Sequence, residues 1–189
     1  MNAAGGTHHA YRNRGEGFCL LNDLAISANY LLETDQINKA LVVDLDVHQG
    51  NGTAVIFQDD PRVFTWSVHG KDNYPIPKEI SDLDHELAFN TEDAEYLKLI
   101  EKTLPQLIQS QKPDIIYFQA GVDVLKTDKL GKLGLTREGC KERDRLVLQT
   151  AFDHEIPIVV TMGGGYSEKI LDIVEAHANT YRTAFSIFE

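Results

Sequence analysis

The fold follows from residues 40–52, ALVVDLDVHQGNG, in which an apolar run leads into carboxylates, an imidazole and glycines. This pattern predicts a buried strand that delivers polar side chains into a loop. Asp46 and His48 lie two positions apart and point to the same face of an extended chain, so their oxygen and nitrogen atoms can converge on one ion. They would supply half of a catalytic zinc site, which takes three protein ligands and leaves one position open.

Asp44 points the same way from one step further back, where it is suited to support the ligands rather than to bind the ion. A strand end with solvated acids is the simpler interpretation of the same residues. The rest of the chain decides between these two interpretations.

The composition indicates a globular protein without a membrane or nucleic-acid partner. The 189 residues are 42% hydrophobic and 25% charged, and no apolar run is long enough to cross a bilayer. We expect no signal peptide at Met1, and Cys19 and Cys140 lack the spacing of a metal site, so we expect reduced thiols and a cytoplasmic protein. The formal net charge of −11 disfavours direct nucleic-acid binding. We expect one domain over residues 1–189.

Strands and helices are expected to alternate along the chain. Apolar residues recur at helical spacing in several stretches, and short apolar runs separate them. This alternation predicts an α/β fold, a three-layer α-β-α sandwich with a mainly parallel sheet. Thr136 and Ser167 are suited to cap helices, and the polar residues 71–90 predict a long irregular loop. Helices are expected near residues 21–32, 52–57, 93–111, 136–152 and 167–181, and strands at residues 40–43, 63–68, 115–119 and 156–161.

A third metal ligand is expected where another strand ends. Ligands bind at the carboxyl ends of the strands in open parallel sheets, and Asp123 follows the expected strand at residues 115–119. It is the natural partner of Asp46 and His48. A zinc ion held by the three would polarise an amide carbonyl and lower the pKa of its bound water.

Two further groups complete this chemistry. His8 and His9 lie in a glycine-rich loop and are candidates for the general base, although two surface histidines would give the same sequence. Tyr166 follows three glycines that let the backbone approach closely, so its hydroxyl can donate to an oxyanion. Together these residues predict metal-assisted amide hydrolysis.

Five motifs, in order and over almost the whole chain, resemble the signatures of the zinc-dependent histone deacetylase family. The motifs are GGTHHA at residues 5–10, GFCLLND at 17–23, DLDVH at 44–48, AGVD at 120–123 and GGGY at 163–166. The resemblance implies the arginase/deacetylase fold and the removal of acetyl or other acyl groups from lysine side chains or related amines. The expected partner is therefore an acylated lysine peptide or protein, or an acylated amine.

The resemblance also assigns roles to residues. It implies a metal ion, Zn²⁺ or alternatively Fe²⁺, bound by Asp46, His48 and Asp123. The implied catalytic residues are His8, His9 and Tyr166, with Asp44 and Asn51 as partners of the histidines. The implied substrate-binding residues are Gly17, Phe18, Tyr74 and Gly164. An inner site for K⁺ or Na⁺ would use Asp44, Asp46, His48, Ser67 and Val68.

Two residues indicate a subclass. Gln49 and Asn51 replace a histidine and an aspartate of other members, and the pattern is similar to the class IV deacetylases and their bacterial relatives. Asn51 would give His9 a neutral partner, whereas His8 would keep the carboxylate of Asp44. A carboxylate partner favours the charged imidazole, so we expect His9 to be neutral more readily and assign it the role of base.

Family members carry a sizeable segment before the first histidine pair. On this resemblance we expect the chain to be truncated, to lack the N-terminal strands of the family domain and to leave one side of the sheet open. We hypothesise that the chain folds poorly or oligomerises through that face, and that its activity is weak.

Deacylation is one of several functions that this fold could host. Ureohydrolases share the fold but bind two manganese ions through Asp-x-His-x-Asp patterns, whereas the order here is Asp-x-Asp-x-His, which favours one metal. Two alternatives stay open: an inactive fragment that acts only as a binding protein, and a deacetylase of acetylpolyamines or other small amines. The acyl-chain length is open as well.

Overall fold

The computed structural model describes residues 1–189 and contains a five-stranded sheet in the order β3-β2-β1-β4-β5. Every neighbouring pair of strands is parallel. All five residues of the central strand β1 are buried, as expected for an apolar run covered on both faces. The strands are β1 Ala40–Asp44, β2 Val63–Gly70, β3 Leu83–Leu87, β4 Ile115–Gln119 and β5 Ile158–Thr161.

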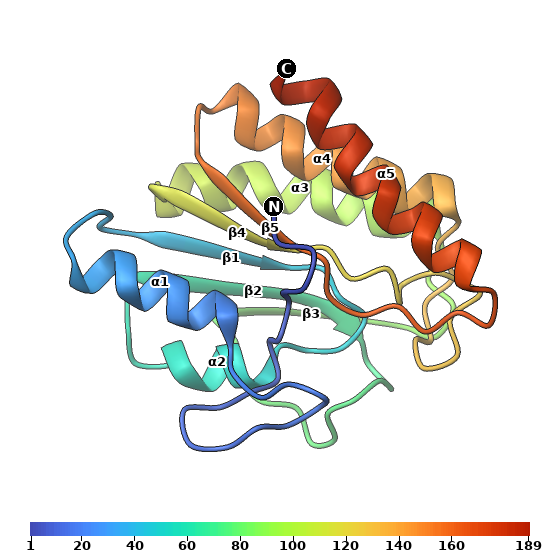
Figure 1. Cartoon of the computed structure of the whole chain (residues 1–189), viewed down its shortest axis with the longest axis horizontal. Coiled ribbons are helices and arrows are strands. Elements are labelled where there is room, and N and C mark those ends of the chain that lie inside the picture. The colour runs from blue at the N-terminus through green and yellow to red at the C-terminus, as the bar shows by residue number, and fades with distance from the viewer.

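Helices cover both faces of the sheet. Figure 1 shows α1 and α2 on one face and α3, α4 and α5 on the other. A core cluster of 26 buried residues joins the sheet to α3 and α4, and a smaller one of 11 residues lies under α1 and α2. The predicted three-layer sandwich is confirmed. The helices are α1 Asp23–Glu33, α2 Asn51–Phe57, α3 Asp93–Gln111, α4 Arg137–Asp153 and α5 Ile170–Phe188.

The structure corrects the prediction of a loop over residues 71–90. That stretch contains β3, which pairs with β2 at the edge of the sheet. Its sequence, LDHEL, lacks an apolar run because an edge strand exposes much of its surface, and four of its five residues are partly or fully exposed. This strand could therefore not be predicted from a search for apolar runs.

One predicted helix cap is confirmed and one is wrong. The Thr136 side chain accepts a hydrogen bond from the Gly139 N–H at 2.9 Å, at the start of α4. Ser167 does not cap α5, which begins at Ile170 after Lys169. The Ser167 hydroxyl is instead hydrogen-bonded to that of Thr127 at 2.9 Å.

Parallel pairing brings the polar loops to one edge of the sheet. Asp44 is in register with Gln119, and Gln119 with Thr161, so the loops after β1, β4 and β5 start side by side. The N-terminal segment lies alongside β5, and the Asn2 N–H donates a hydrogen bond to the Val160 carbonyl at 2.8 Å. Residues 5–10 thereby reach the same edge (Figure 1). No helix is both long enough and apolar enough to span a membrane.

Candidate metal and catalytic site

The side chains of Asp46, His48 and Asp123 converge at the carboxyl ends of β1 and β4. Each offers a ligand atom, and these atoms lie within 4.8 Å of one another. The His48 Nδ1 atom is 3.1 Å from Asp46 Oδ1 and 3.1 Å from Asp123 Oδ2. Two carboxylates and one imidazole form a donor set that suits a divalent transition metal, zinc included.

Main-chain amides orient both carboxylates. Asp46 accepts hydrogen bonds from the His48 N–H at 3.0 Å and the Gly164 N–H at 2.9 Å, and Asp123 accepts one from the Val47 N–H at 3.0 Å. A Cβ atom at Gly164 would overlap Asp123 Oδ2. The triad is thus assembled from three loops that interlock through the backbone.

The charges of the triad favour a bound cation. Burial disfavours the charged imidazole of His48, but Asp123 and Asp46 together outweigh it and raise the pKa of His48 to about 10. Burial and the charge of Asp46 raise the pKa of Asp123 to about 7. Burial also acts to raise the pKa of Asp46, but His8 and His48 outweigh it and lower that pKa. Buried acids around one nitrogen fit a metal, which would replace the proton on His48.

Beside the triad, His8 and His9 lie with their rings 4.1 Å apart and differ in their partners. His8 Nδ1 is 2.6 Å from Asp44 Oδ2, and His9 Nδ1 is 2.7 Å from Asn51 Oδ1. Burial lowers the pKa of an imidazole, but Asp44 and Asp46 raise that of His8 to about 9. Burial and the neighbouring His8 lower the pKa of His9 to about 3. The difference has the sign predicted from the sequence.

The orientation of Asn51 fixes the tautomer of His9. The Asn51 Nδ2 group donates to the Tyr11 hydroxyl at 3.0 Å and to Glu16 Oε1 at 2.9 Å, so Oδ1 faces His9 as an acceptor. The His9 Nδ1 must then carry the proton, which leaves the Nε2 lone pair free. Glu16 also accepts a hydrogen bond from the Tyr74 hydroxyl.

A cavity of about 380 Å³ opens onto these groups. Gly17 has φ +53°, and a Cβ there would overlap the His9 ring, so this backbone can pass close to the site only as glycine. The exposed Phe18 ring lies 6.4 Å from that of Tyr166. The lining residues are His9, Gly17, Phe18, His48, Asp72, Asn73, Tyr74, Leu130, Lys132 and Tyr166.

The tyrosines frame the inner part of this cavity. The Tyr74 ring lies 5.1 Å from that of His9, and the Tyr166 ring lies 6.4 Å from that of His48. Burial and the nearby Asp123 raise the pKa of Tyr166 to about 12. The Tyr166 hydroxyl therefore stays protonated near neutral pH and can donate a hydrogen bond.

Several predicted site residues do not line this cavity, among them Gly164, Ser67 and Val68. Gly164 is partly exposed and lies against Asp123 and Tyr166, and its role in substrate binding stays a prediction. Ser67 and Val68 lie on β2, with Ser67 in register with Asp44. The Ser67 hydroxyl is hydrogen-bonded to His69 Nδ1 at 2.9 Å. The inner K⁺ or Na⁺ site stays a prediction.

Sequence reasoning missed three residues that support the site: Tyr11, Glu16 and Arg143. Tyr11 and Glu16 hold Asn51 from positions 40 and 35 residues away, and nothing in the local sequence indicates this pairing. Arg143 is fully buried. Its place on the apolar stripe of α4, three residues after Cys140, was a signal that could have found it.

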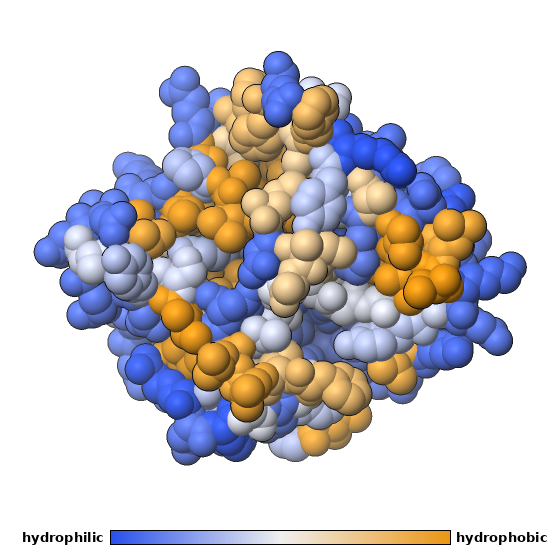
Figure 2. Space-filling model, viewed as in Figure 1, coloured by the Kyte–Doolittle hydropathy of each residue, from blue (hydrophilic) through white to orange (hydrophobic).

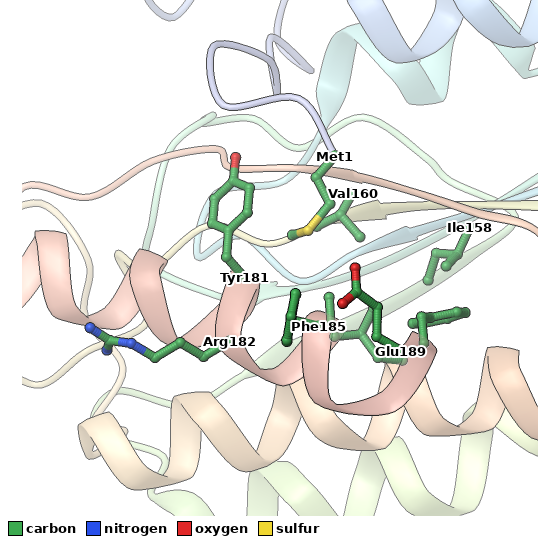
Figure 3. Close-up of a pocket in the computed structure, with 10 residues that line it drawn as sticks. Met1, Ile158, Val160, Tyr181, Arg182, Phe185 and Glu189 are labelled. Carbon is green, nitrogen blue, oxygen red and sulfur yellow. The ribbon is translucent and has the colours of Figure 1, made fainter.

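A larger cavity, of about 810 Å³, lies away from this chemistry between β5 and α5. Figure 3 shows Met1, Val160, Tyr181 and Phe185 around it. Its lining is mostly apolar, and Figure 2 shows apolar surface on this side of the molecule. It holds no cluster of metal-binding side chains, so the smaller cavity is the candidate site.

Known proteins share both the sequence and the fold. An uncharacterized protein of Picosynechococcus sp. is 46% identical over 187 residues, which are 99% of this chain and 62% of that protein. Histone deacetylase 2 of Arabidopsis thaliana is 30% identical over 177 residues, 92% of this chain and 46% of that protein. The crystal structure of acetylpolyamine aminohydrolase from Burkholderia pseudomallei has a TM-score of 0.82 at 24% identity, covering 97% of this chain and 54% of that one.

The chain spans less than two thirds of each of these proteins. A family comparison gives the clearest assignment, because the family described as Histone deacetylase domain matches residues 1–181. This match covers the triad, the histidine pair and Tyr166 together. The chain belongs to the histone deacetylase domain family.

Proposed function

We propose that the chain is a zinc-dependent amidohydrolase that removes acetyl or other acyl groups from lysine side chains or related amines. One observation carries this proposal: the metal-binding triad lies beside two histidines whose pKa values are shifted in opposite directions. Groups with separated pKa values at one site are typical of acid–base catalysis. The named relative from Arabidopsis thaliana, a histone deacetylase, supports the same reaction.

Asp46, His48 and Asp123 would hold the metal, with Zn²⁺ as the proposed ion and Fe²⁺ as the alternative. A bound divalent metal supplies Lewis acidity that polarises the amide carbonyl and lowers the pKa of a water molecule. His9, neutral and with a free Nε2, is the group that can accept a proton from that water. K⁺ or Na⁺ at the inner site is part of the proposal.

The other side chains would stabilise the charge that develops during the reaction and orient the substrate. His8 stays protonated beside Asp44 and keeps a positive charge near the reacting amide. The Tyr166 hydroxyl can donate to the oxyanion that forms when the carbonyl is attacked. Phe18 and Tyr74 flank the cavity and offer aromatic surface to the methylene chain of an acyl-lysine.

The test measures metal content together with hydrolysis of a fluorogenic acetyl-lysine peptide. Tyr166→Phe is expected to lower turnover by about 100- to 1000-fold, the usual loss for one oxyanion donor, without changing the metal content. Tyr181→Phe is the matched control, because the Tyr181 hydroxyl contacts Met162 Sδ at 3.3 Å beside the larger cavity. It is expected to leave turnover unchanged.

An acetylated polyamine in the same assay tests the alternative substrate. Its support is the shared fold of acetylpolyamine aminohydrolase. If the chain hydrolyses the polyamine faster than the peptide, the proposed substrate becomes an acetylated small amine. Metal binding without turnover of either substrate would refute hydrolysis by this chain and leave the binding protein that the sequence also allows.

A further inference from the structure

Behind the triad lies a buried ion pair that the catalytic scheme does not use. Arg143 and Asp144 on α4 are both 0% exposed. The Arg143 Nε donates to Asp144 Oδ1 at 2.9 Å, and Nη2 is 2.7 Å from the same oxygen. Thr180 on α5 donates to the other carboxylate oxygen of Asp144 at 2.6 Å. Asp144 thus fixes one side of the guanidinium within the helical layer.

The other side of the guanidinium faces the sheet. The Arg143 Nη1 donates to the Leu45 carbonyl at 3.2 Å and to the Gly121 carbonyl at 2.6 Å. Leu45 immediately precedes Asp46, and Gly121 comes two residues before Asp123. One nitrogen therefore ties together the two loops that each supply a carboxylate of the triad.

The tie matters because these loops belong to different strands. Asp46 follows β1 and Asp123 follows β4, so the separation of their carboxylates depends on contacts between the loops. The hydrogen bond from the Val47 N–H to Asp123 at 3.0 Å also links the two loops, but its acceptor is a carboxylate that would bind the metal. In the two loops Arg143 contacts only main-chain carbonyls and so leaves the ligand carboxylates free, and its planar guanidinium fixes the direction of several hydrogen bonds at once.

We propose that Arg143 is a positioning residue that sets the separation and orientation of Asp46 and Asp123 for metal binding. This inference rests on the metal site proposed above. Groups that orient metal ligands from behind typically change metal affinity by about 10- to 100-fold when they are removed. An ion pair that served only to attach α4 to the sheet would change stability and leave the affinity of the folded protein unaltered.

The test compares zinc affinity, by competition with a chromophoric chelator, among folded variants of the whole chain. Arg143→Met combined with Asp144→Asn removes both charges together, so no buried charge is left unpaired. We expect about a 10- to 100-fold loss of affinity in this double variant. Arg143→Lys keeps the charge but not the guanidinium geometry, and we expect it to lose affinity as well.

Two control variants separate positioning from stability. Leu148→Ala removes buried side-chain volume on the same helix, where Leu148 is 0% exposed and lines the larger cavity between β5 and α5, and is expected to lower stability. Thr180→Val removes the hydrogen bond to Asp144 but leaves both bonds from Arg143 to the carbonyls. Both variants are expected to bind zinc with unaltered affinity. The visible absorption of bound Co²⁺ gives a second readout, which should change for Arg143→Lys and not for the controls.

Three outcomes would refute the inference. Unaltered zinc affinity and an unaltered Co²⁺ spectrum in Arg143→Lys would show that the ion pair is only structural, even if the double variant does not fold. An equal loss of affinity in Leu148→Ala would assign the effect to stability. Failure of the unsubstituted chain to bind zinc would refute the metal site itself, and is distinguished from the other outcomes because it appears before any substitution is made.

Discussion

Replacing Asn51 by aspartate is predicted to raise the pKa of His9 and to narrow the pH range of activity. In the structure the neutral Asn51 Oδ1 atom lies 2.7 Å from His9 Nδ1. Burial and the charge of His8 lower the pKa of His9 to about 3. A carboxylate in the position of the Asn51 amide would stabilise the charged imidazole that the present environment disfavours.

The size of the effect follows from the separation of the charge centres, which lie further apart than the two hydrogen-bonded atoms because each charge is spread over its whole group. Two unit charges about 4 Å apart interact by about 4 kcal/mol at an effective dielectric constant of about 20. At about 1.4 kcal/mol for each pKa unit, the pKa of His9 would rise by about 3 units, to near 6. Glu16 opposes this rise through the introduced carboxyl group. Its Oε1 atom now accepts a hydrogen bond from Asn51 Nδ2 at 2.9 Å, and in the variant the like charge would raise the pKa of the new carboxyl and reduce the negative charge that faces His9. The full shift is therefore expected when Asn51→Asp is combined with Glu16→Gln.

The assay is the pH dependence of kcat/KM for the acetyl-lysine peptide. A general base must be neutral, so activity falls as the pH drops through the pKa of His9, and a raised pKa moves the acid limb to higher pH. Glu16→Gln alone is the control and should leave the acid limb in place. The assignment of His9 as base would be refuted if the acid limbs of Asn51→Asp, the double variant and the unsubstituted protein coincided.

Three further predictions concern the metal and the fold. Gly164→Ala places a methyl group where Asp123 Oδ2 lies, so zinc affinity should fall by about 10-fold or more in a competition titration, and an unchanged affinity would contradict the geometry. Metal should stabilise the folded chain by about 2.7 kcal/mol at a free concentration about 100 times its Kd, seen as a higher Tm that a chelator reverses; a Tm insensitive to metal would argue against the site. Thr136→Ala removes the cap that holds the Gly139 N–H at 2.9 Å and the hydrogen bond from the same hydroxyl to Asp93 at 2.6 Å, and should cost about 1 to 2 kcal/mol in urea unfolding while kcat/KM stays constant.

Most of the fold could be predicted because parallel strands buried on both faces have continuous apolar sequences. β1 and β4 are apolar throughout most of their length, and both were placed within one residue of their observed bounds. β3 could not be predicted in this way, since an edge strand has no need of an apolar run. The predicted start of α5 is wrong because Ser167 is a good cap by residue type, yet its hydroxyl is hydrogen-bonded to that of Thr127.

The candidate site likewise contains residues that the sequence predicts and residues that it does not. Residues whose own chemistry is unusual at a strand end, such as Asp46, His48 and Asp123, could be found from the sequence, and the structure brings them together. Residues that act only through a distant partner could not. Glu16 has a role only because folding brings it within hydrogen-bond distance of Asn51, and Arg143 only because two loops from different strands meet beneath α4.

The acid–base properties show why residue identity alone is insufficient. Asp46 and Asp123 are the same residue type, both fully buried and both beside His48, yet the pKa of one is lowered and that of the other is raised. The difference arises because His8 adds its charge to the side of Asp46, while Asp123 faces the negative charge of Asp46. His8 and His9 differ for the same kind of reason, since a carboxylate holds one and an amide holds the other. A sequence specifies which groups can react, but the neighbours supplied by folding decide which of them carries the proton.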